Sequence, residues 1–350
     1  MKTLPLLFLF SFVQWTCQSP ADTTTTEYMY TGTSESDSTK MAGINFVAPP
    51  TPFSKNPMPA IEAVGINWIA VVPFAYTRLG EAKVRFDSDR QWWGERREGT
   101  IETVRLAKAA GFKVMIKPQV YIPGSWPGGL DFKTDKRWEA WEKDYEKYIM
   151  TFAAIADSMD VELFCIGTEF KFSEQKREQF WRQLIKKIRA QYKGKLVYAS
   201  NWDSYMDVPF WDALDYIGID AYFPLVDKKD PSIEEIKKEW HKYFKAIKKL
   251  HLKTNRPVLF TEYGYLSVDR CTYNNWELEK DLRRHPINEQ AQANALDALH
   301  AIFWEEPFYH GGFIWKWFPN LEDSRRSRSR GYTPQGKIGE EVLKKWYLRE

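Results

Sequence analysis

Cysteine and histidine are scarce in this 350-residue sequence, which has three of the first and five of the second. Neither type shows the short spacing of a zinc site, so no metal and no organic cofactor is expected. The net charge of +3 is too small to indicate a nucleic-acid partner. The sequence also lacks a Gly-x-Ser-x-Gly segment, so an esterase would have no nucleophile. These absences argue against a zinc protein, a nucleic-acid-binding protein and an esterase.

The N-terminus carries an apolar run, residues 4–13, that follows Lys2 and is too short to cross a bilayer. Its length is typical of a signal peptide, and we expect residues 1–17 to form one. Cys17 resembles the lipidated cysteine of bacterial lipoproteins, although the three residues before it are unusual for such a site. Secretion and a lipid anchor at Cys17 therefore both stay open, and either one makes the protein extracytoplasmic: secreted, periplasmic or surface-anchored. Residues 18–40, rich in Thr and Ser, predict a flexible tether.

Two cysteines remain in the mature part of the chain, Cys165 and Cys271. Cys165 lies within an apolar segment, which predicts a small buried side chain. A disulfide bond between these two cysteines stays open at this point.

Aromatic residues are plentiful, with 16 Trp, 18 Tyr and 22 Phe. A core accounts for many of them, but sixteen Trp exceed what a core needs, because each buried indole must find a partner for its N–H. Sugar rings have apolar faces that lie flat on indoles. The composition therefore favours a carbohydrate-binding site.

From Met41 onward, short apolar segments alternate with longer amphipathic ones. We predict strands at residues 42–48, 68–74, 113–119, 162–168, 196–201, 216–221, 257–261 and 312–317. We predict helices at residues 58–64, 100–110, 138–158, 176–191, 209–214, 233–250, 289–305 and 338–346. Ser232 and Glu235 have the spacing of a capping box at the start of one helix.

This alternation predicts a (β/α)8 TIM barrel that forms a single domain, residues 41–350. Strands that read as continuous apolar runs suit a parallel sheet buried on both faces. The alternative is an open, doubly wound sheet. Residues 46–50, after the first strand, lack the glycines of a dinucleotide-binding turn, and this favours the barrel.

Strands four and seven each close on a lone glutamate, Glu169 and Glu262. Active sites of such barrels lie at the C-terminal ends of the strands, where side chains from opposite strands can converge. Glycoside hydrolysis uses two carboxyl groups, one as a proton donor and one as a nucleophile in retaining enzymes, where they lie about 5–5.5 Å apart. We predict this pair as the catalytic site. The alternative for each glutamate is an ion pair with a basic side chain on the barrel rim.

The segments Ile-Gly-Thr-Glu-Phe (166–170) and Phe-Thr-Glu-Tyr-Gly-Tyr (260–265) resemble those of the glycosidase clan with catalytic residues on strands four and seven. Within this clan the chain is similar to glycoside hydrolase family 113, the β-1,4-mannanases. Further similar segments are residues 43–46, 117–120, 218–225, 312–317 and 332–337. The resemblance implies a retaining, endo-acting enzyme that cleaves mannan-type polysaccharide, with Glu169 as acid/base and Glu262 as nucleophile.

Thr168 stands where most members of the clan have an asparagine that binds the substrate 2-hydroxyl. The axial 2-hydroxyl of mannose is compatible with this difference, but the sugar preference stays open. By resemblance, Tyr222 donates a hydrogen bond to the nucleophile, and Trp315 forms the floor of the subsite where the bond is cut. Trp317 shares the parity of Trp315, so both can face the pocket.

Several other residues follow the predicted strands and could bind sugar hydroxyls, with internal bonding or loop packing as the alternative: Asn45, Lys117, Gln119, Asn201 and Trp202. Trp126, in a turn-rich loop after the third strand, is a candidate platform for a sugar ring. Two other functions stay open: hydrolysis of another β-glycan, such as glucan or xylan, and non-catalytic glycan binding. The paired glutamates argue against the second.

Overall fold

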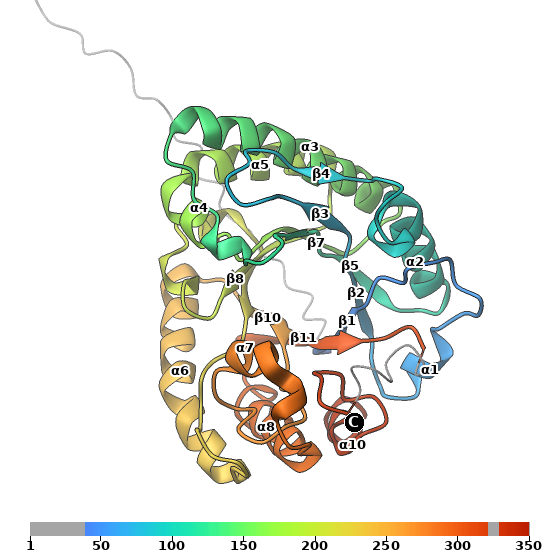
Figure 1. Cartoon of the computed structure of the whole chain (residues 1–350), viewed down its shortest axis with the longest axis vertical. Helices are drawn as coiled ribbons and strands as arrows, with labels where there is room; N and C mark the ends of the chain where they lie inside the picture. Colours follow the sequence, from blue (N-terminus) through green and yellow to red (C-terminus); the bar gives the residue numbers. More distant parts are fainter. Residues whose placement is uncertain (1–38, 321–328, 350) are drawn as a thin grey trace, which may run out of the picture. The chain divides into compact units, whose positions relative to one another are not determined.

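Eight parallel strands close into a barrel in the order β1-β11-β10-β9-β8-β7-β5-β2 (Figure 1). This arrangement comes from a computed structural model, which describes residues 39–320 and 329–349. The barrel strands are β1 (Met41–Phe46), β2 (Trp68–Val71), β5 (Lys113–Ile116), β7 (Leu163–Thr168), β8 (Lys195–Asn201), β9 (Tyr216–Asp220), β10 (Val258–Tyr263) and β11 (Tyr309–Trp317). Each one overlaps a predicted strand. The predicted (β/α)8 barrel is therefore confirmed, and the open sheet is wrong.

Helices surround the barrel (Figure 1). They are α1 (Pro59–Glu62), α2 (Arg97–Ala109), α3 (Asp135–Ser158), α4 (Lys171–Lys176), α5 (Glu178–Gln191), α6 (Ile233–Thr254), α8 (Glu289–Phe303) and α10 (Ile338–Tyr347). Helix α6 begins with the predicted capping box between Ser232 and Glu235. The prediction of a helix at residues 209–214 is wrong. Only the 3-10 turn η4 (Trp211–Ala213) forms, because strand β9 begins three residues later.

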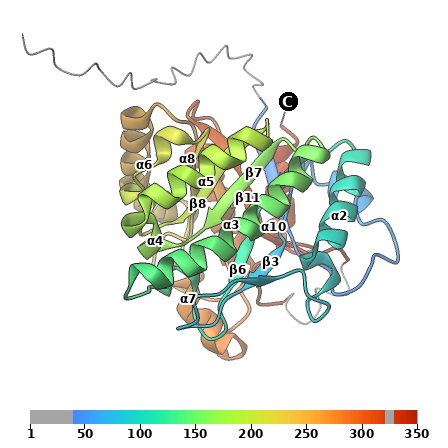
Figure 2. The ribbon, with the colours of Figure 1, turned by 90° about the horizontal axis from the view of Figure 1, so that it is seen from above.

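Two predicted strands are longer than the barrel strands that they contain. Pro73 and Pro118 interrupt them, because proline has no N–H to donate to a neighbouring strand. Beyond the prolines the chain forms β3 (Phe74–Tyr76) and β6 (Gln119–Tyr121), which pair with each other in parallel. Strand β4 (Arg85–Phe86) pairs with β3 and completes a small sheet. Figure 2 shows β3 and β6 at the same end of the barrel as α7 (Asn275–Leu278), the end where the site lies.

Side chains alternate between two sides of the barrel wall. One buried cluster includes Ala70, Cys165 and Leu259, whereas their neighbours Ile69 and Phe260 belong to a second cluster that also contains side chains of the helices. This alternation is expected of strands buried on both faces. The prediction that Cys165 is buried is confirmed, and Cys165 and Cys271 are both free thiols.

The predicted signal peptide with Cys17, and residues 18–38 of the predicted tether, lie outside the described residues. In the described part of the chain, none of the helices has the length and apolar composition needed to span a membrane.

Candidate active site

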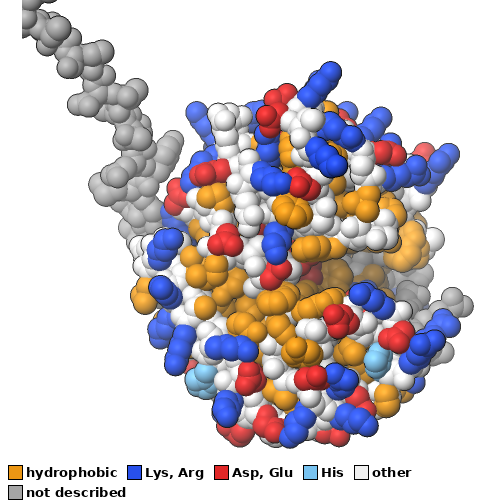
Figure 3. All heavy atoms as spheres, turned by 60° about the vertical axis from the view of Figure 1, so that its left-hand side comes forward, with side chains coloured by type: hydrophobic (Ala, Val, Ile, Leu, Met, Phe, Trp, Pro, Cys, Tyr) orange, Lys and Arg blue, Asp and Glu red, His pale blue; other side chains and the backbone are white. Residues whose placement is uncertain are grey.

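A pocket of about 640 Å³ opens at the C-terminal ends of the barrel strands. Nine of the twelve predicted site residues line it. The other three, Lys117, Asn45 and Trp317, do not. Aromatic side chains form much of the wall, and Figure 3 shows a hollow bordered by hydrophobic side chains on this side of the protein.

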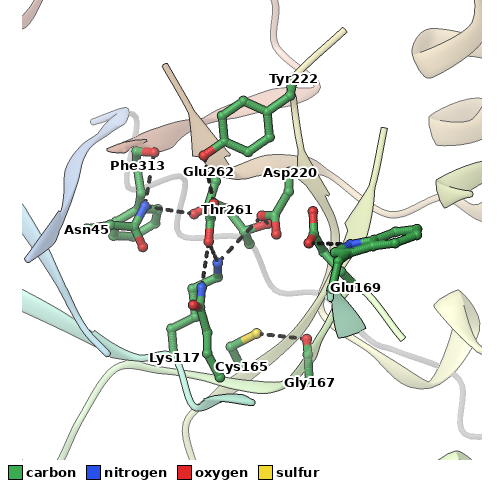
Figure 4. Close-up of polar contacts among 12 residues, drawn as sticks. Asn45, Lys117, Cys165, Gly167, Glu169, Asp220, Tyr222, Thr261, Glu262 and Phe313 are labelled. Atoms are coloured by element: carbon green, nitrogen blue, oxygen red, sulfur yellow. Dashed lines mark hydrogen bonds and ion pairs between the residues drawn. The ribbon is translucent and has the colours of Figure 1, made fainter. Parts of the chain in front are cut away.

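Glu262, near the end of β10, is buried, and its carboxylate accepts three side-chain hydrogen bonds (Figure 4). Oε1 accepts from the Lys117 ammonium and, at 2.6 Å, from the Gln119 amide. Oε2 accepts from the Tyr222 hydroxyl at 2.7 Å. Three donors from two segments, residues 117–119 and Tyr222, therefore fix the orientation of this carboxylate. Tyr222 contacts Glu262 as the resemblance implies, whereas Gln119 binds the carboxylate directly.

The prediction that Lys117 binds sugar hydroxyls is wrong. Lys117 lies between the end of β5 and Pro118, and its side chain is fully buried below the pocket. Its ammonium lies between Glu262 and Asp220, with 3.6 Å from Nζ to Oδ1 of Asp220. Burial lowers the pKa of Lys117, but the two carboxylates outweigh burial and raise it. Lys117 therefore supplies a positive charge beneath Glu262.

Asp220 is a residue that sequence reasoning missed. It ends β9, is fully buried, and accepts a 2.7 Å hydrogen bond from the Thr261 hydroxyl. Burial and the neighbouring Glu262 raise the pKa of Asp220 to about 7, against the opposing effect of Lys117. The signal that could have found it is the one used for the glutamates, since Asp220 also closes an apolar strand.

Lys117→Met should lower the free energy of unfolding by about 3–5 kcal/mol, because it leaves two carboxylates buried without their cation. Chemical denaturation measures this change. The matched control is Lys186→Met on an exposed face of α5, where we expect less than about 0.5 kcal/mol. Equal effects of the two substitutions would contradict the assigned role of Lys117.

Glu169 follows β7 directly and has a left-handed backbone, with φ of +57°. Its carboxylate accepts a 2.9 Å hydrogen bond from the indole of Trp126, the predicted platform, which is 37% exposed and lines the pocket. Burial raises the pKa of Glu169 well above its usual range, and the charges of Asp220 and Glu262 add to this effect. The Lys117 charge and the indole hydrogen bond oppose it. Glu169 is therefore disposed to hold a proton beside a carboxylate that is hydrogen-bonded on both oxygens.

The two tryptophans of β11 do not share a side. Trp315 lines the pocket, whereas Trp317 is buried in the core, so the prediction of Trp317 as a binding residue is wrong. The register explains the difference: Ile44 of β1 pairs with Ile314, but Phe46 pairs with Trp317. Strand β11 thus has one residue more than β1 over this stretch, and such an irregularity breaks the alternation of side chains. The peptide bond between Trp315 and Lys316 is cis.

The prediction for Asn45 is also wrong. Its buried side-chain amide donates to the backbone carbonyl groups of Thr261 at 3.1 Å and Phe313 at 3.2 Å. It therefore ties β1 to β10 and β11. Thr168 and Asn201 do line the pocket. The Thr168 hydroxyl is buried and has no hydrogen-bond partner among the described residues.

Trp276, on α7, was not predicted, because it does not directly follow any of the predicted strands. Its ring stacks on Trp202, with 5.5 Å between ring centroids and 19° between planes, and both line the pocket. Lys316 and Glu279 add one charge of each sign to the same wall. Burial lowers the pKa of Lys316 and raises that of Glu279. The pocket wall thus offers flat aromatic faces together with polar groups.

Within residues 39–320 and 329–349, His, Cys, Asp and Glu side chains form no cluster that could hold a metal ion.

A (β/α)8 barrel with two glutamates and aromatic walls at its strand ends has the parts that a glycoside hydrolase requires. The sequence pattern of Glycoside Hydrolase Family 113 matches residues 50–337. The chain belongs to this family and is a glycoside hydrolase, which confirms the resemblance stated from the sequence. A comparison with curated proteins gives no match.

Solved structures share the fold. A family 113 β-mannanase from Alicyclobacillus acidocaldarius has a TM-score of 0.77 at 24% identity, with 89% of this chain and 98% of that chain covered. A second family 113 β-1,4-mannanase has a TM-score of 0.76 at 23% identity, with 89% and 100% covered. A β-glucuronidase from Ruminococcus gnavus is more distant, with a TM-score of 0.58 at 13% identity and coverage of 88% and 50%.

Proposed function

We propose that this chain is a retaining endo-β-1,4-mannanase, with Glu262 as nucleophile and Glu169 as acid/base. One observation carries the assignment of roles: Glu262 is held by three donors in the pocket that also contains Glu169, whose pKa is raised. Membership of family 113 and the β-mannanases among the similar structures support mannan as the substrate.

In the first step Glu262 attacks the anomeric carbon while Glu169 gives its proton to the departing glycosidic oxygen. Lys117, Gln119 and Tyr222 hold the attacking carboxylate in one orientation. The resulting glycosyl ester removes the negative charge of Glu262, which is one cause of the raised pKa of Glu169. The pKa of Glu169 then falls, so it can take a proton from the water that attacks the same carbon and releases Glu262.

The walls beside Glu169 suit the sugar on the leaving-group side. The acid must reach the glycosidic oxygen, so this sugar lies on the Glu169 side of the cut. Trp126 contacts Glu169 there, and Trp202 follows β8, the strand next to β7. Stacking against these indoles favours a polysaccharide bound on both sides of the cleaved bond.

Release of sugar from mannan, glucan and xylan by the purified enzyme tests the substrate. We expect activity on mannan, and activity on glucan with none on mannan would overturn the proposal. Mannohexaose cleaved in oxygen-18 water, with products resolved by mass, locates the bonds that are cut. Release of mannose alone from one end would contradict endo action, and NMR of the first product anomer tests retention.

The rate should depend on pH in a bell shape. Activity falls as pH rises through the raised pKa of Glu169, because the acid loses its proton, whereas the attacking carboxyl group must be ionised. In profiles of kcat/KM, Asp220→Asn should shift the alkaline limb to lower pH, since the Asp220 charge helps to raise the pKa of Glu169. A rate that stays flat from acid to neutral pH would contradict the two roles.

We also propose that the chain acts outside the cytoplasm, on the basis of the apolar run and Cys17 near its N-terminus. Lipid attachment at Cys17 would hold the enzyme at a membrane surface, and its absence would release it. The mass of the mature N-terminal peptide distinguishes these two forms, and an uncleaved N-terminus would contradict export.

A further inference from the structure

A second buried carboxyl group, Glu174, lies behind Glu169 and outside the pocket. It belongs to α4, the short helix that begins two residues after Glu169, and it is fully buried. Its Oε1 accepts a 2.7 Å hydrogen bond from the hydroxyl of Tyr198 on the neighbouring strand β8. The Ser200 hydroxyl lies 3.3 Å from both of its oxygens. The mechanism proposed above makes no use of this group.

The Tyr198 hydroxyl has a second partner, because it accepts a 2.9 Å hydrogen bond from the backbone N–H of Phe170. Tyrosine has a single hydroxyl proton, and Tyr198 uses it to donate the hydrogen bond to Glu174. The lone pairs of the oxygen therefore remain for Phe170. Glu174 thus determines the direction of the Tyr198 hydrogen bond, and Tyr198 in turn satisfies a buried backbone donor.

This contact matters because Phe170 follows Glu169, whose left-handed backbone is rare for a residue with a side chain. Two further hydrogen bonds hold the turn: the Glu169 N–H donates to Ala199 at 2.8 Å, and the Lys171 N–H donates to the Glu169 carbonyl at 2.9 Å. The Tyr198 bond is the one made by a side chain. Loss of it would free the peptide unit that aims the Glu169 carboxyl group.

We infer that Tyr198 and Glu174 form a positioning pair that holds Glu169 in place to protonate the leaving group. The inference rests on the proposed role of Glu169. It predicts a specific defect, since an enzyme with a misplaced acid should fail on poor leaving groups and keep its activity on good ones.

Tyr198→Phe tests this, because it removes the hydroxyl and keeps the ring. We expect kcat/KM on mannohexaose to fall about 10- to 100-fold, as for a catalytic group displaced by about 1 Å. On 2,4-dinitrophenyl β-mannobioside, whose leaving group departs without a proton, we expect a loss of less than about threefold, because general-acid catalysis is not needed there. The matched control is Tyr192→Phe, whose buried hydroxyl donates to the Val161 carbonyl at 2.7 Å, and it should change neither value.

A pair of variants at position 174 gives an independent test. Glu174→Gln keeps an oxygen that accepts from Tyr198 and should stay close to wild type. Glu174→Met removes the acceptor and should reproduce the leaving-group dependence of Tyr198→Phe. This comparison of the two Glu174 variants tests the positioning role even if Tyr198→Phe fails to fold. Circular dichroism would reveal such a failure.

Equal losses on both substrates, or no loss on either, would overturn the inference. Glu169→Gln serves as the reference and should show the same dependence with a larger loss on mannohexaose. If Glu169→Gln lacks this dependence, the proposed role of Glu169 fails. If only the Tyr198 and Glu174 variants lack it, the positioning role alone fails.

Discussion

Glu262→Ala should lower kcat/KM on mannan by about 10⁴- to 10⁶-fold, the range expected when a covalent nucleophile is removed. Among the described residues that line the pocket, the other carboxyl groups have different positions: Glu169 beside Trp126, Asp203 beside Asn201, and Glu279 on the wall that carries Lys316. None of them replaces the carboxylate held by Lys117, Gln119 and Tyr222. Release of reducing sugar measures the loss.

Two variants separate catalysis from stability at this position. Glu262→Ala also leaves the buried Lys117 with Asp220 as its remaining anion, at 3.6 Å, so we expect it to unfold more easily. Glu262→Gln keeps an oxygen that can accept from Lys117 and Gln119, and should be equally inactive but more stable than the alanine variant. Activity in either variant above about one hundredth of wild type would contradict a nucleophilic role.

Glu169→Ala should lower kcat/KM on mannan by about 10²- to 10⁴-fold, the usual contribution of a general acid. The loss should be smaller than at Glu262, because the nucleophile that forms the glycosyl ester is still present. On an activated aryl glycoside the loss should be smaller again, because its leaving group departs without a proton donor. The alkaline limb of the pH profile should disappear with the residue whose raised pKa produces it.

Kinetics on two substrates check the role of Glu169. The measurement is kcat/KM for mannohexaose and for 2,4-dinitrophenyl β-mannobioside, each across the pH range. Trp126→Phe provides the matched control, because it removes the indole hydrogen bond to Glu169 and retains the acid. An alkaline limb that persists without Glu169 would assign the titration to another group and contradict the acid role.

The two carboxyl groups owe their different roles to different surroundings. Glu262 has three donors on its two oxygens, one of them charged, whereas Glu169 has one neutral donor and two acidic neighbours. The same side chain can therefore serve as a proton donor in one place and as a nucleophile in the other. Lys117 and Asp220 contribute to this difference from beneath the pocket, without lining it.

The sequence by itself determined the eight strands, most of the helices, the capping box at Ser232 and the presence of Glu169 and Glu262 at strand ends. These features depend on local periodicity and on the change from apolar to ionisable residues at the end of a strand. They do not require knowledge of which segments meet.

Tertiary structure alone determined which side chains surround the C-terminal ends of the barrel strands. Lys117 lies below the pocket, whereas Gln119, on the other side of Pro118, lies in its wall. The extra residue of β11 separates Trp317 from Trp315. Trp276, on α7, reaches Trp202 from 74 positions further along the chain. The physical reason is common to all three: the direction of a side chain at a strand end depends on how that strand pairs and where its neighbours stop, and pairing joins residues that are distant in sequence.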